Sequence, residues 1–286
     1  METNQQKVLA CVDGSTVSEA VCDYAVWMAQ GIDTPLELLH TVDHHDSKAR
    51  TNLSGNIGLG TQEHLLEELI QVEQQRSKLL LQQGKLMLES AKKRVVDAGI
   101  KNPASHQRHG NLVESLIDLE KDIRVLVLGM EGQQDPETPH LSRRLESIMR
   151  TLHRPMLIVN DKFKKPERIM IAYDGSEAAD KAVGMVASSP LCKDLQCHLV
   201  CVDNDEVAAE GVLSIAADKL HSAGIELLTS KLQGKPEVEL CAYQENHQID
   251  LTIMGAFSHT RIHDLLLGSF TIKMLLNTKK PVLLLR

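Results

Sequence analysis

The segment with the clearest potential for chemistry runs from Gly255 to Lys273 and connects an apolar stretch, 251–254, to the beginning of a helical pattern. Gly268 and Ser269 stand where that helix would begin. Glycine allows a backbone to approach a ligand closely, and the first N–H groups of a helix lack intrahelical partners and attract anions. The segment therefore predicts a phosphate-binding connection. A glycine-capped turn at the surface is the alternative interpretation.

The chain that positions this segment contains an internal duplication. An apolar strand pattern that ends in Asp-Gly-Ser occupies 7–15 and recurs at 168–176. The step from Asp13 to Asp174 is 161 residues. A helical pattern follows each copy of this strand. Each copy therefore begins with the same strand, turn and helix.

Later parts of the two copies are separated by a shorter step. Asp43 and Asp203, which follow the second strands, are 160 residues apart, whereas Gly129 and Gly255 are 126 residues apart. The difference places an insertion of about 35 residues in the first copy, within 44–98.

Each copy alternates five short apolar strands with helical patterns. This alternation is typical of an α/β domain with a parallel, doubly wound sheet, in which ligands bind beyond the carboxyl ends of the strands. We expect a first domain over 1–160, a linker over 161–167 and a second domain over 168–286. Because exposed strand edges need covering, the last strands, 155–159 and 281–285, are expected to meet.

The insertion divides into two parts. Residues 46–61 are polar and contain glycines, which indicates a loop, whereas 62–98 predicts a long amphipathic helix broken near Gly84. We expect this helix to pack over the sheet and to project past it. Its apolar stripe favours packing within the chain, with dimerisation as the alternative. The stripe consists of Leu65, Leu66, Leu69, Val72, Leu79, Leu80, Gln83, Leu86 and Met87.

Composition excludes several classes of protein. The formal net charge of −8 argues against nucleic-acid binding through a basic face. No apolar run approaches the ~18 residues of a membrane span, and the first residues lack the pattern of a signal peptide. The six cysteines include no Cys-x-x-Cys pair and are expected to be reduced core residues. We therefore expect a cytoplasmic protein.

Catalytic and metal-binding motifs give no comparable signal. The sequence contains no Gly-x-Ser-x-Gly and no Walker lysine motif. The run Asp43-His-His-Asp46 is interpreted as a loop, because adjacent side chains point in different directions and cannot converge on a metal. We assign no catalytic residue and no metal ligand.

The repeated Asp-Gly-Ser and the pattern Gly-x-x-Ser-x9-Gly-Ser at 255–269 resemble the universal stress protein family in its tandem, two-domain form. Nucleotide-binding members of that family carry Gly-x-x-Gly-x9-Gly-[Ser/Thr]. The resemblance covers nearly the whole chain except the insertion. It implies two flavodoxin-like, Rossmann-like domains of the adenine nucleotide alpha hydrolase type, each with a five-stranded parallel sheet, that form an internal pseudo-dimer.

The resemblance also implies a nucleotide site in the second domain. The base or ribose would lie beside Asp174, and Val202 would line the adenine slot. Two residues depart from the pattern, because Ser258 replaces a glycine and Phe270 is bulkier than usual. The remaining implied contacts are Gly255 and Ser258 at the ribose and phosphates, and Gly268, Ser269 and Thr271 at the phosphate oxygens.

The first domain keeps less of this pattern. Asp13, Gly129 and Gly132 are present, but Ser142 and Arg143 stand in register with the second copy's Gly-Ser. We expect this site to be degenerate and the first domain to act as a scaffold.

The resulting hypothesis is a cytoplasmic stress protein whose second domain binds ATP or a related adenine nucleotide. Mg²⁺ would be held between Asp174 and the phosphates. The nucleotide would alter conformation or the choice of a protein partner, and a homodimer is a further expectation. An interaction module of the same fold that binds no nucleotide and a slow ATP hydrolase are the alternatives.

Overall fold

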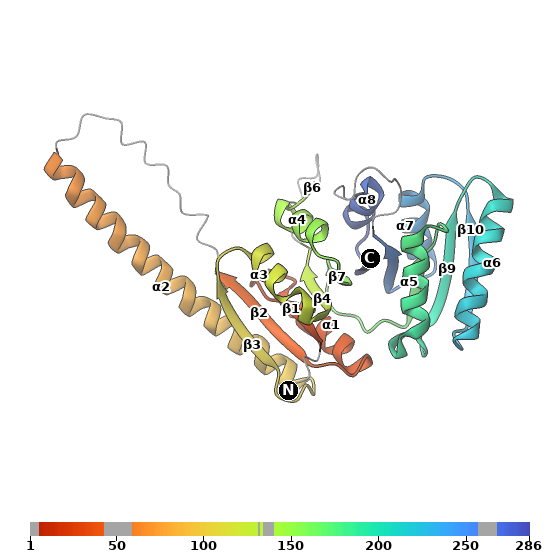
Figure 1. Cartoon of the computed structure of the whole chain (residues 1–286), viewed down its shortest axis with the longest axis horizontal. Coiled ribbons are helices and arrows are strands. Elements are labelled where there is room, and N and C mark those ends of the chain that lie inside the picture. The colour runs from red at the N-terminus through yellow and green to blue at the C-terminus, as the bar shows by residue number, and fades with distance from the viewer. Residues whose placement is uncertain (1–5, 43–58, 131, 134–139, 257–267) are drawn as a thin grey trace.

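The computed structural model of the chain describes residues 6–42, 59–130, 132–133, 140–256 and 268–286. Its two domains lie side by side, and one long helix extends away from them (Figure 1). None of the helices in these ranges is long and apolar enough to cross a membrane.

The first domain alternates strands and helices as its sequence pattern predicts. Its elements are β1 (Lys7–Cys11), α1 (Ser18–Gly31), β2 (Leu36–Val42), α2 (Leu59–Asp97), β3 (Ala104–His109), α3 (Leu112–Leu119), the 3-10 turn η2 (Glu120–Asp122), β4 (Ile123–Gly129), β5 (Gly132–Gln133), β6 (His140–Leu141), α4 (Arg143–Thr151) and β7 (Met156–Val159).

The second domain repeats this order without the insertion. Its elements are β8 (Arg168–Ala172), α5 (Glu177–Ser188), the 3-10 turn η3 (Pro190–Cys192), β9 (Gln196–Val202), α6 (Glu206–Ser222), β10 (Leu227–Leu232), α7 (Pro236–Asn246), β11 (Leu251–Gly255), α8 (Ser269–Asn277) and β12 (Val282–Leu285).

Ten strands form one continuous sheet in the order β10-β9-β8-β11-β12-β7-β4-β1-β2-β3. Within this ten-stranded sheet, neighbouring strands of the same domain are parallel, and β12 pairs with β7 in the antiparallel direction. The expected doubly wound α/β fold and the expected meeting of the two last strands are both confirmed. The two domains are therefore halves of one pseudo-symmetric sheet.

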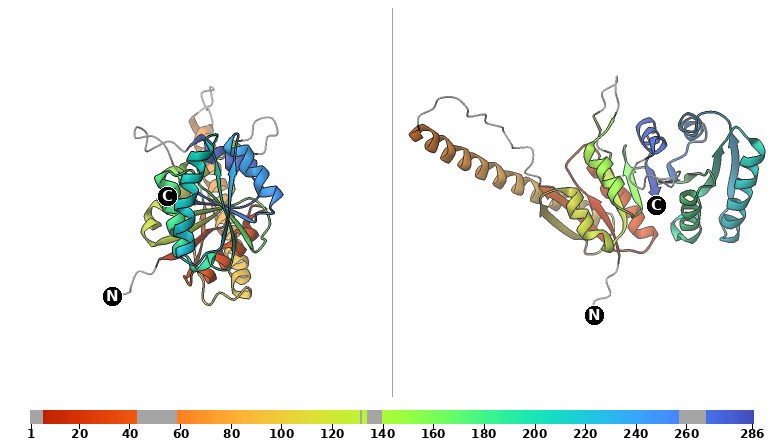
Figure 2. Two further views of the ribbon diagram at one scale, coloured as in Figure 1. Left: turned by 90° about the vertical axis from the view of Figure 1, so that its right-hand side faces the viewer. Right: turned by 45° about the horizontal axis from the view of Figure 1, so that its top comes forward.

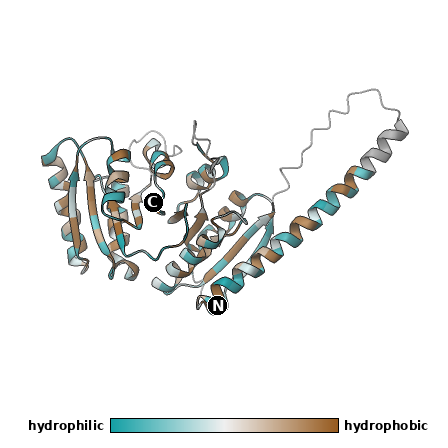
Figure 3. Cartoon of the chain, turned by 180° about the vertical axis from the view of Figure 1, so that it is seen from behind, coloured by the Kyte–Doolittle hydropathy of each residue, from teal (hydrophilic) through white to brown (hydrophobic). Residues whose placement is uncertain are grey.

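Helices cover both faces of this sheet, as Figure 2 shows from two further directions. One apolar core lies under α1, α2, α5 and α6, and a second lies under α3, α4, α7 and α8. The central strands are apolar on both faces, which is what a parallel sheet covered on both sides requires (Figure 3).

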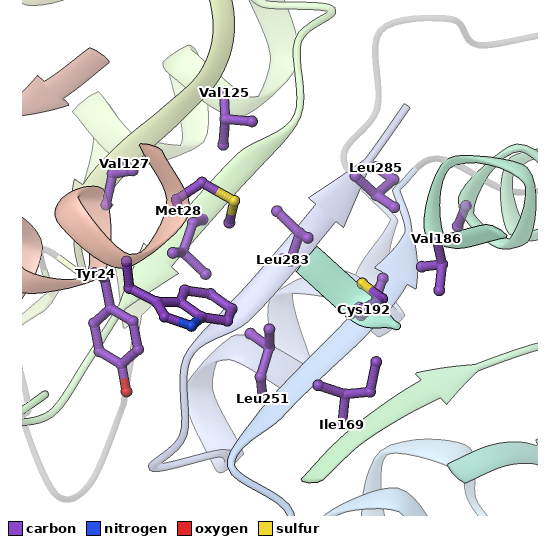
Figure 4. Packing of buried hydrophobic residues seen from close by; sticks show 14 of the residues in the cluster. Tyr24, Met28, Val125, Val127, Ile169, Val186, Cys192, Leu251, Leu283 and Leu285 are labelled. Carbon is purple, nitrogen blue, oxygen red and sulfur yellow. The ribbon is translucent and has the colours of Figure 1, made fainter. Parts of the chain in front are cut away.

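Both cores continue across the boundary between the domains. At the junction, Leu157 of β7 pairs with Leu283 of β12, and both are buried. Met28 of the first domain lies near the second domain's Leu283, and Cys192 belongs to the same core on this face of the sheet (Figure 4). The C-terminal Arg286 donates to the Leu152 carbonyl oxygen at 3.0 Å. The boundary is thus packed as an interior.

Helix α2 differs from its prediction in two respects. The first is that it is unbroken at Gly84. The backbone of Gly84 lies so close to β2 and β3 that an added Cβ would come within 2.6 Å of the His40 ring and 2.4 Å of Gln107 Nε2. Glycine at this position therefore permits close packing and does not mark a break. The helix also begins at Leu59, inside the segment expected to be a loop.

Helix α2 packs over the sheet and projects past it as expected, but the expected packing of its apolar stripe within the chain is wrong for Val72, Leu79 and Leu86, of which Leu86 is 62% exposed. Its C-terminal part buries Leu88, Ala91 and Val95 against the first domain. Further towards the N-terminus, Val72 and Leu79 are 59% and 65% exposed.

Strands β5 and β6 form a short antiparallel pair. Gly132 pairs with Leu141, and Leu141 is buried. Two-residue strands carry too little periodicity to be recognised from a sequence.

The linker is fastened by Asp250, a buried carboxylate at the beginning of β11. Its side chain accepts hydrogen bonds from Lys164 Nζ at 2.6 Å, Glu167 N at 3.0 Å and Arg168 N at 3.1 Å. Burial raises the pKa of Asp250, but these donors outweigh it and hold the pKa below the ordinary value. Asp250 therefore fixes the path of the chain between the domains.

We expect Asp250→Ala to lower the free energy of unfolding at pH 7 by about 2–3 kcal/mol, because two backbone N–H groups lose their acceptor. The depressed pKa makes this stabilisation present above the ordinary carboxyl pKa and lost as the pH falls through the folded value. The deficit should therefore shrink below about pH 4. Urea titrations between pH 7 and 3 measure it, with exposed Asp218→Ala as the control. Equal effects of both substitutions would contradict this role.

Candidate functional site

A cavity of about 410 Å³ opens at the carboxyl ends of β8, β9 and β11, between α7 and α8. Both apolar and polar residues line this cavity. The apolar ones, called the apolar wall below, include Ala172, Val200, Val202, Leu240 and Met254, and the polar ones include Asp174, Ser176, Glu237, Ser269 and Lys273. Four of the residues expected at the site, Asp174, Val202, Gly255 and Ser269, line this cavity together.

Asp174 lies in a tight turn after β8. Its carboxylate accepts a hydrogen bond from Ser176 N at 3.0 Å, and Gly175 has a φ of +74°, which favours glycine. Ser176 then caps α5 by accepting from Ala179 N at 3.2 Å. The repeated Asp-Gly-Ser is therefore a turn that fixes a carboxylate at the mouth of the cavity.

Gly255 ends β11 where the strand passes the first turn of α5. An added Cβ would lie 2.6 Å from Ala178 C and 2.7 Å from Ala179 N. These are backbone atoms of a capped helix and have little freedom to move. Glycine is required here by the approach of two backbones, which also shapes the floor of the cavity.

The beginning of α8 forms the anion-attracting part of the site. Gly268 is the N-cap residue and has no side chain with which to cap the helix. Its carbonyl oxygen accepts from Ile272 N at 3.2 Å, and no side chain among the described residues caps the first turn of α8, whose N–H groups have no partner within the helix. Ser269 lines the cavity beside them. Positive helix potential and donors therefore meet at one end of the cavity.

Lys273 and Glu237 form an ion pair at the cavity that sequence reasoning missed. Lys273 Nζ lies 2.8 Å from Glu237 Oε1, and the hydrogen bond from Lys273 lowers the pKa of Glu237. Lys273 is four residues after Ser269, so helical spacing alone could have placed both on one side of α8. Glu237, on the separate helix α7, gave no such signal.

Three further residues that the sequence singled out in the second domain have different outcomes. Phe270, noted as bulky, does line the cavity and packs against the core. The Thr271 side chain is 2% exposed and is not among the cavity-lining residues, so its phosphate contact stays a prediction. Ser258 lies outside the described residues.

The first domain aligns with the second by a uniform step through its first two strands. Leu9 pairs with Glu37 in the first copy, and Met170 pairs with His198 in the second, which gives a step of 161 for both strands. Asp43 and Asp203, which are 160 residues apart, are therefore offset by one residue in the structural alignment, which agrees with a repeat whose register holds within a residue. A shift of one residue exchanges the two faces of a strand, so strand pairing decides which residues of the two domains correspond.

Strand pairing also sets which second-strand residues correspond. Thr41 stands in register with Val202, so a residue with a hydroxyl replaces an aliphatic one at this position. Asp13 accepts hydrogen bonds from Ser15 N at 2.9 Å and Ser18 Oγ at 2.7 Å. Burial raises the pKa of Asp13, but these hydrogen bonds lower the pKa by more, so it lies below the ordinary value.

The clearest difference between the domains is the start of α4. Ser142, in register with Gly268, is the N-cap residue, and its Oγ accepts from Leu145 N at 3.1 Å. A side chain thus caps α4, whereas no described side chain caps α8. Nearby, Gly132 begins the β5–β6 hairpin.

Comparison with known proteins agrees with the duplicated architecture. A family model described as "Universal stress protein family" matches residues 5–160 and again 166–286. A universal stress protein of Synechocystis sp. is 36% identical over 286 residues, covering 98% of this chain and 100% of that protein.

Solved structures show the same fold. The crystal structure of a universal stress protein from Archaeoglobus fulgidus has a TM-score of 0.72 at 18% identity, covering 100% of this chain and 99% of that one. A protein of unknown function from Pseudomonas aeruginosa has a TM-score of 0.63 at 13% identity, covering 98% of this chain and 92% of that one.

We expect Gly255→Ala to destabilise the protein by about 1–3 kcal/mol, because its Cβ would press on fixed backbone. Gly129→Ala is the matched control in the first domain, where the nearest atom is Val17 Cγ2 of a side chain, at 2.7 Å. Urea unfolding of both variants measures the difference. A Gly255→Ala variant no less stable than Gly129→Ala would contradict the assigned close approach.

Proposed function

The chain belongs to the universal stress protein family, and we propose that its second domain binds ATP or a related adenine nucleotide. The bound nucleotide would change the conformation or partner choice of the protein in a stress response. The observation that carries the proposal is the N-terminus of α8, which no described side chain caps and which borders a cavity that is partly lined by apolar residues.

The two sides of the cavity match the two ends of an adenine nucleotide. An adenine ring is flat and largely apolar, and the wall formed by Val200, Val202 and Leu240 provides a surface against which it can stack. The phosphates would occupy the opposite end, where Ser269 and the N–H groups of α8 supply donors. Asp174, fixed in its turn between these ends, would face the ribose.

Lys273 supplies positive charge that the phosphates need in a protein with a formal net charge of −8. Its present partner, Glu237, is replaceable by a phosphate oxygen because the Lys273 side chain is 55% exposed and flexible. When Mg²⁺ is bound, it would neutralise phosphate charge and be held by the phosphates together with Asp174. Nucleotide binding would thereby exchange one ion pair for another at the start of α8.

We propose one nucleotide site in each chain and a scaffolding role for the first domain. Ser142 already caps α4, and Thr41 puts a hydroxyl where the second domain has Val202. We also place this function in the cytoplasm. The six cysteines form no disulfide, and five of them are buried, which suits a reducing compartment.

Purified full-length protein should release an adenine nucleotide on denaturation, or bind added ATP when released ligand is absent. Ligand that binds only the folded state stabilises it by about 2.7 kcal/mol at 100 times its Kd, so ATP should raise the melting temperature. Titrations with and without Mg²⁺ measure the contribution of the cation. Absence of both released nucleotide and binding up to about 1 mM ATP would contradict the proposal and favour a non-binding interaction module.

Gly268→Ser tests the site itself, because it gives α8 the cap that α4 already has. The substitution should leave folding intact, since an added Cβ at Gly268 meets only Thr271 Oγ1, at 3.9 Å. Stability should change by no more than a few tenths of a kcal/mol, whereas ATP affinity should fall at least about 10-fold. The measurements are isothermal titration calorimetry and urea unfolding.

Ser142→Gly is the matched control for this substitution. It removes the cap of α4 and should leave ATP affinity in the second domain unchanged. Unaltered binding by Gly268→Ser, or loss of binding by Ser142→Gly, would show that the site is assigned to the wrong helix.

A further inference from the structure

Helix α2 extends well beyond the domain that holds its C-terminal part, as both views show (Figures 1 and 2). The carbonyl oxygen of Leu81 accepts a hydrogen bond from Gln107 Nε2 at 3.2 Å, and packing on the sheet follows from Gly84 onward. Residues 59–80 precede this contact and would span roughly 33 Å at 1.5 Å per residue. More than half of α2 therefore projects from the body of the protein.

The projecting part carries an apolar stripe with two charges in it. Leu69, Val72, Leu79 and Leu80 follow one another at spacings of three, seven and one residues, which at 3.6 residues per turn places them along one side of a helix. Glu73 and Arg76 stand between them on the same side, and both are exposed. The remaining surface of this part is mostly polar, with Gln71, Gln74, Gln75 and Lys78.

A projecting helix without a packing partner is expected to be only marginally stable in water. Helices gain most of their stability from packing an apolar face. Ile70, Val72 and Leu79 are 56%, 59% and 65% exposed. Exposed apolar surface of this extent is typical of an interaction site.

We propose that this stripe is the interface with a second copy of the chain, joined as an antiparallel pair of α2 helices. The register follows from the charges. Glu73 would lie opposite the partner's Arg76, and by two-fold symmetry Arg76 would lie opposite the partner's Glu73. The same register places Leu69 opposite the partner's Leu80, so a pair of leucines flanks the two ion pairs at each end.

Charge selects both the occupant and the orientation. In a parallel pair, Glu73 would face Glu73 and Arg76 would face Arg76, and like charges at an interface are strongly unfavourable. The sequence around this point has the same asymmetry, with Glu63, Glu67 and Glu68 before it and Lys78 and Lys85 after it. Antiparallel pairing sets the acidic part of each helix against the basic part of the other. The surface is therefore complementary to itself.

The pairing leaves the contacts of the first domain in place. Its central positions, 69–80, come before Leu81 and before the part of α2 that packs on β2 and β3. The two bodies would lie at opposite ends of the helix pair. The interface would be separate from the strand edges, because β7 and β12 already cover each other within one chain.

Charge exchange between positions 73 and 76 tests the proposal. Sedimentation analysis of the full-length chain between roughly 1 and 100 µM should find a dimer. Glu73→Arg and Arg76→Glu should each raise the dimer Kd at least about 100-fold, because like charges then meet. The double exchange, E73R with R76E, should restore the wild-type Kd. Lys78→Glu, on the polar side, reverses a charge of the same sign as Arg76 and should change the Kd little.

Circular dichroism and urea unfolding of each variant establish that the domains remain folded. A wild-type chain that stays monomeric throughout this range would overturn the proposal and favour another occupant, such as residues 46–58 or a different protein. A dimer that both single exchanges leave intact, or that the double exchange fails to restore, would place the interface elsewhere. ATP binding is measured in parallel and should be unaffected, so failure here is distinct from failure of the nucleotide site.

Discussion

The antiparallel pairing of β7 with β12 is the constraint on which the rest of the molecule depends. Each domain alone would end in an apolar strand with unpaired N–H and C=O groups, an arrangement prone to association with other chains. Pairing the two edges satisfies these groups and joins two small cores into two larger ones that cross the boundary. Asp250 and the linker, together with Arg286, hold this junction from either side. In the duplicated chain, the β7–β12 interface therefore forms within one chain and needs no association of two separate domains.

Duplication also left two versions of one site, and a single position separates them most clearly. At the start of α8 the N-cap residue is a glycine, and no side chain of the described residues caps the helix, whereas at the start of α4 the Ser142 hydroxyl accepts from Leu145 N. The two turns after the first strands remain alike, with a carboxylate that accepts from the serine N–H two residues later. Similar scaffolds can therefore differ in whether a side chain caps the helix that follows the fourth strand.

Much of this was accessible from the sequence, for reasons that are physical. Buried parallel strands must be apolar, and the Asp-Gly-Ser turn needs a glycine with positive φ, so both left strong local signals. Gly84 was misread because a glycine that permits close helix packing has the same sequence signature as one that breaks a helix. The Lys273–Glu237 ion pair joins two separate helices, and its acidic partner could not be located before the fold was known. Which residues of the two second strands correspond was decided only by strand pairing.

The most direct measurement is a crystal structure of the full-length chain grown with a non-hydrolysable ATP analogue and Mg²⁺. Our account requires electron density for the analogue in the second domain, with its phosphates at the N-terminus of α8 and its base against Val202. It also requires that no analogue occupy the start of α4. Density at α4, or a second-domain cavity that stays empty at saturating analogue, would contradict it.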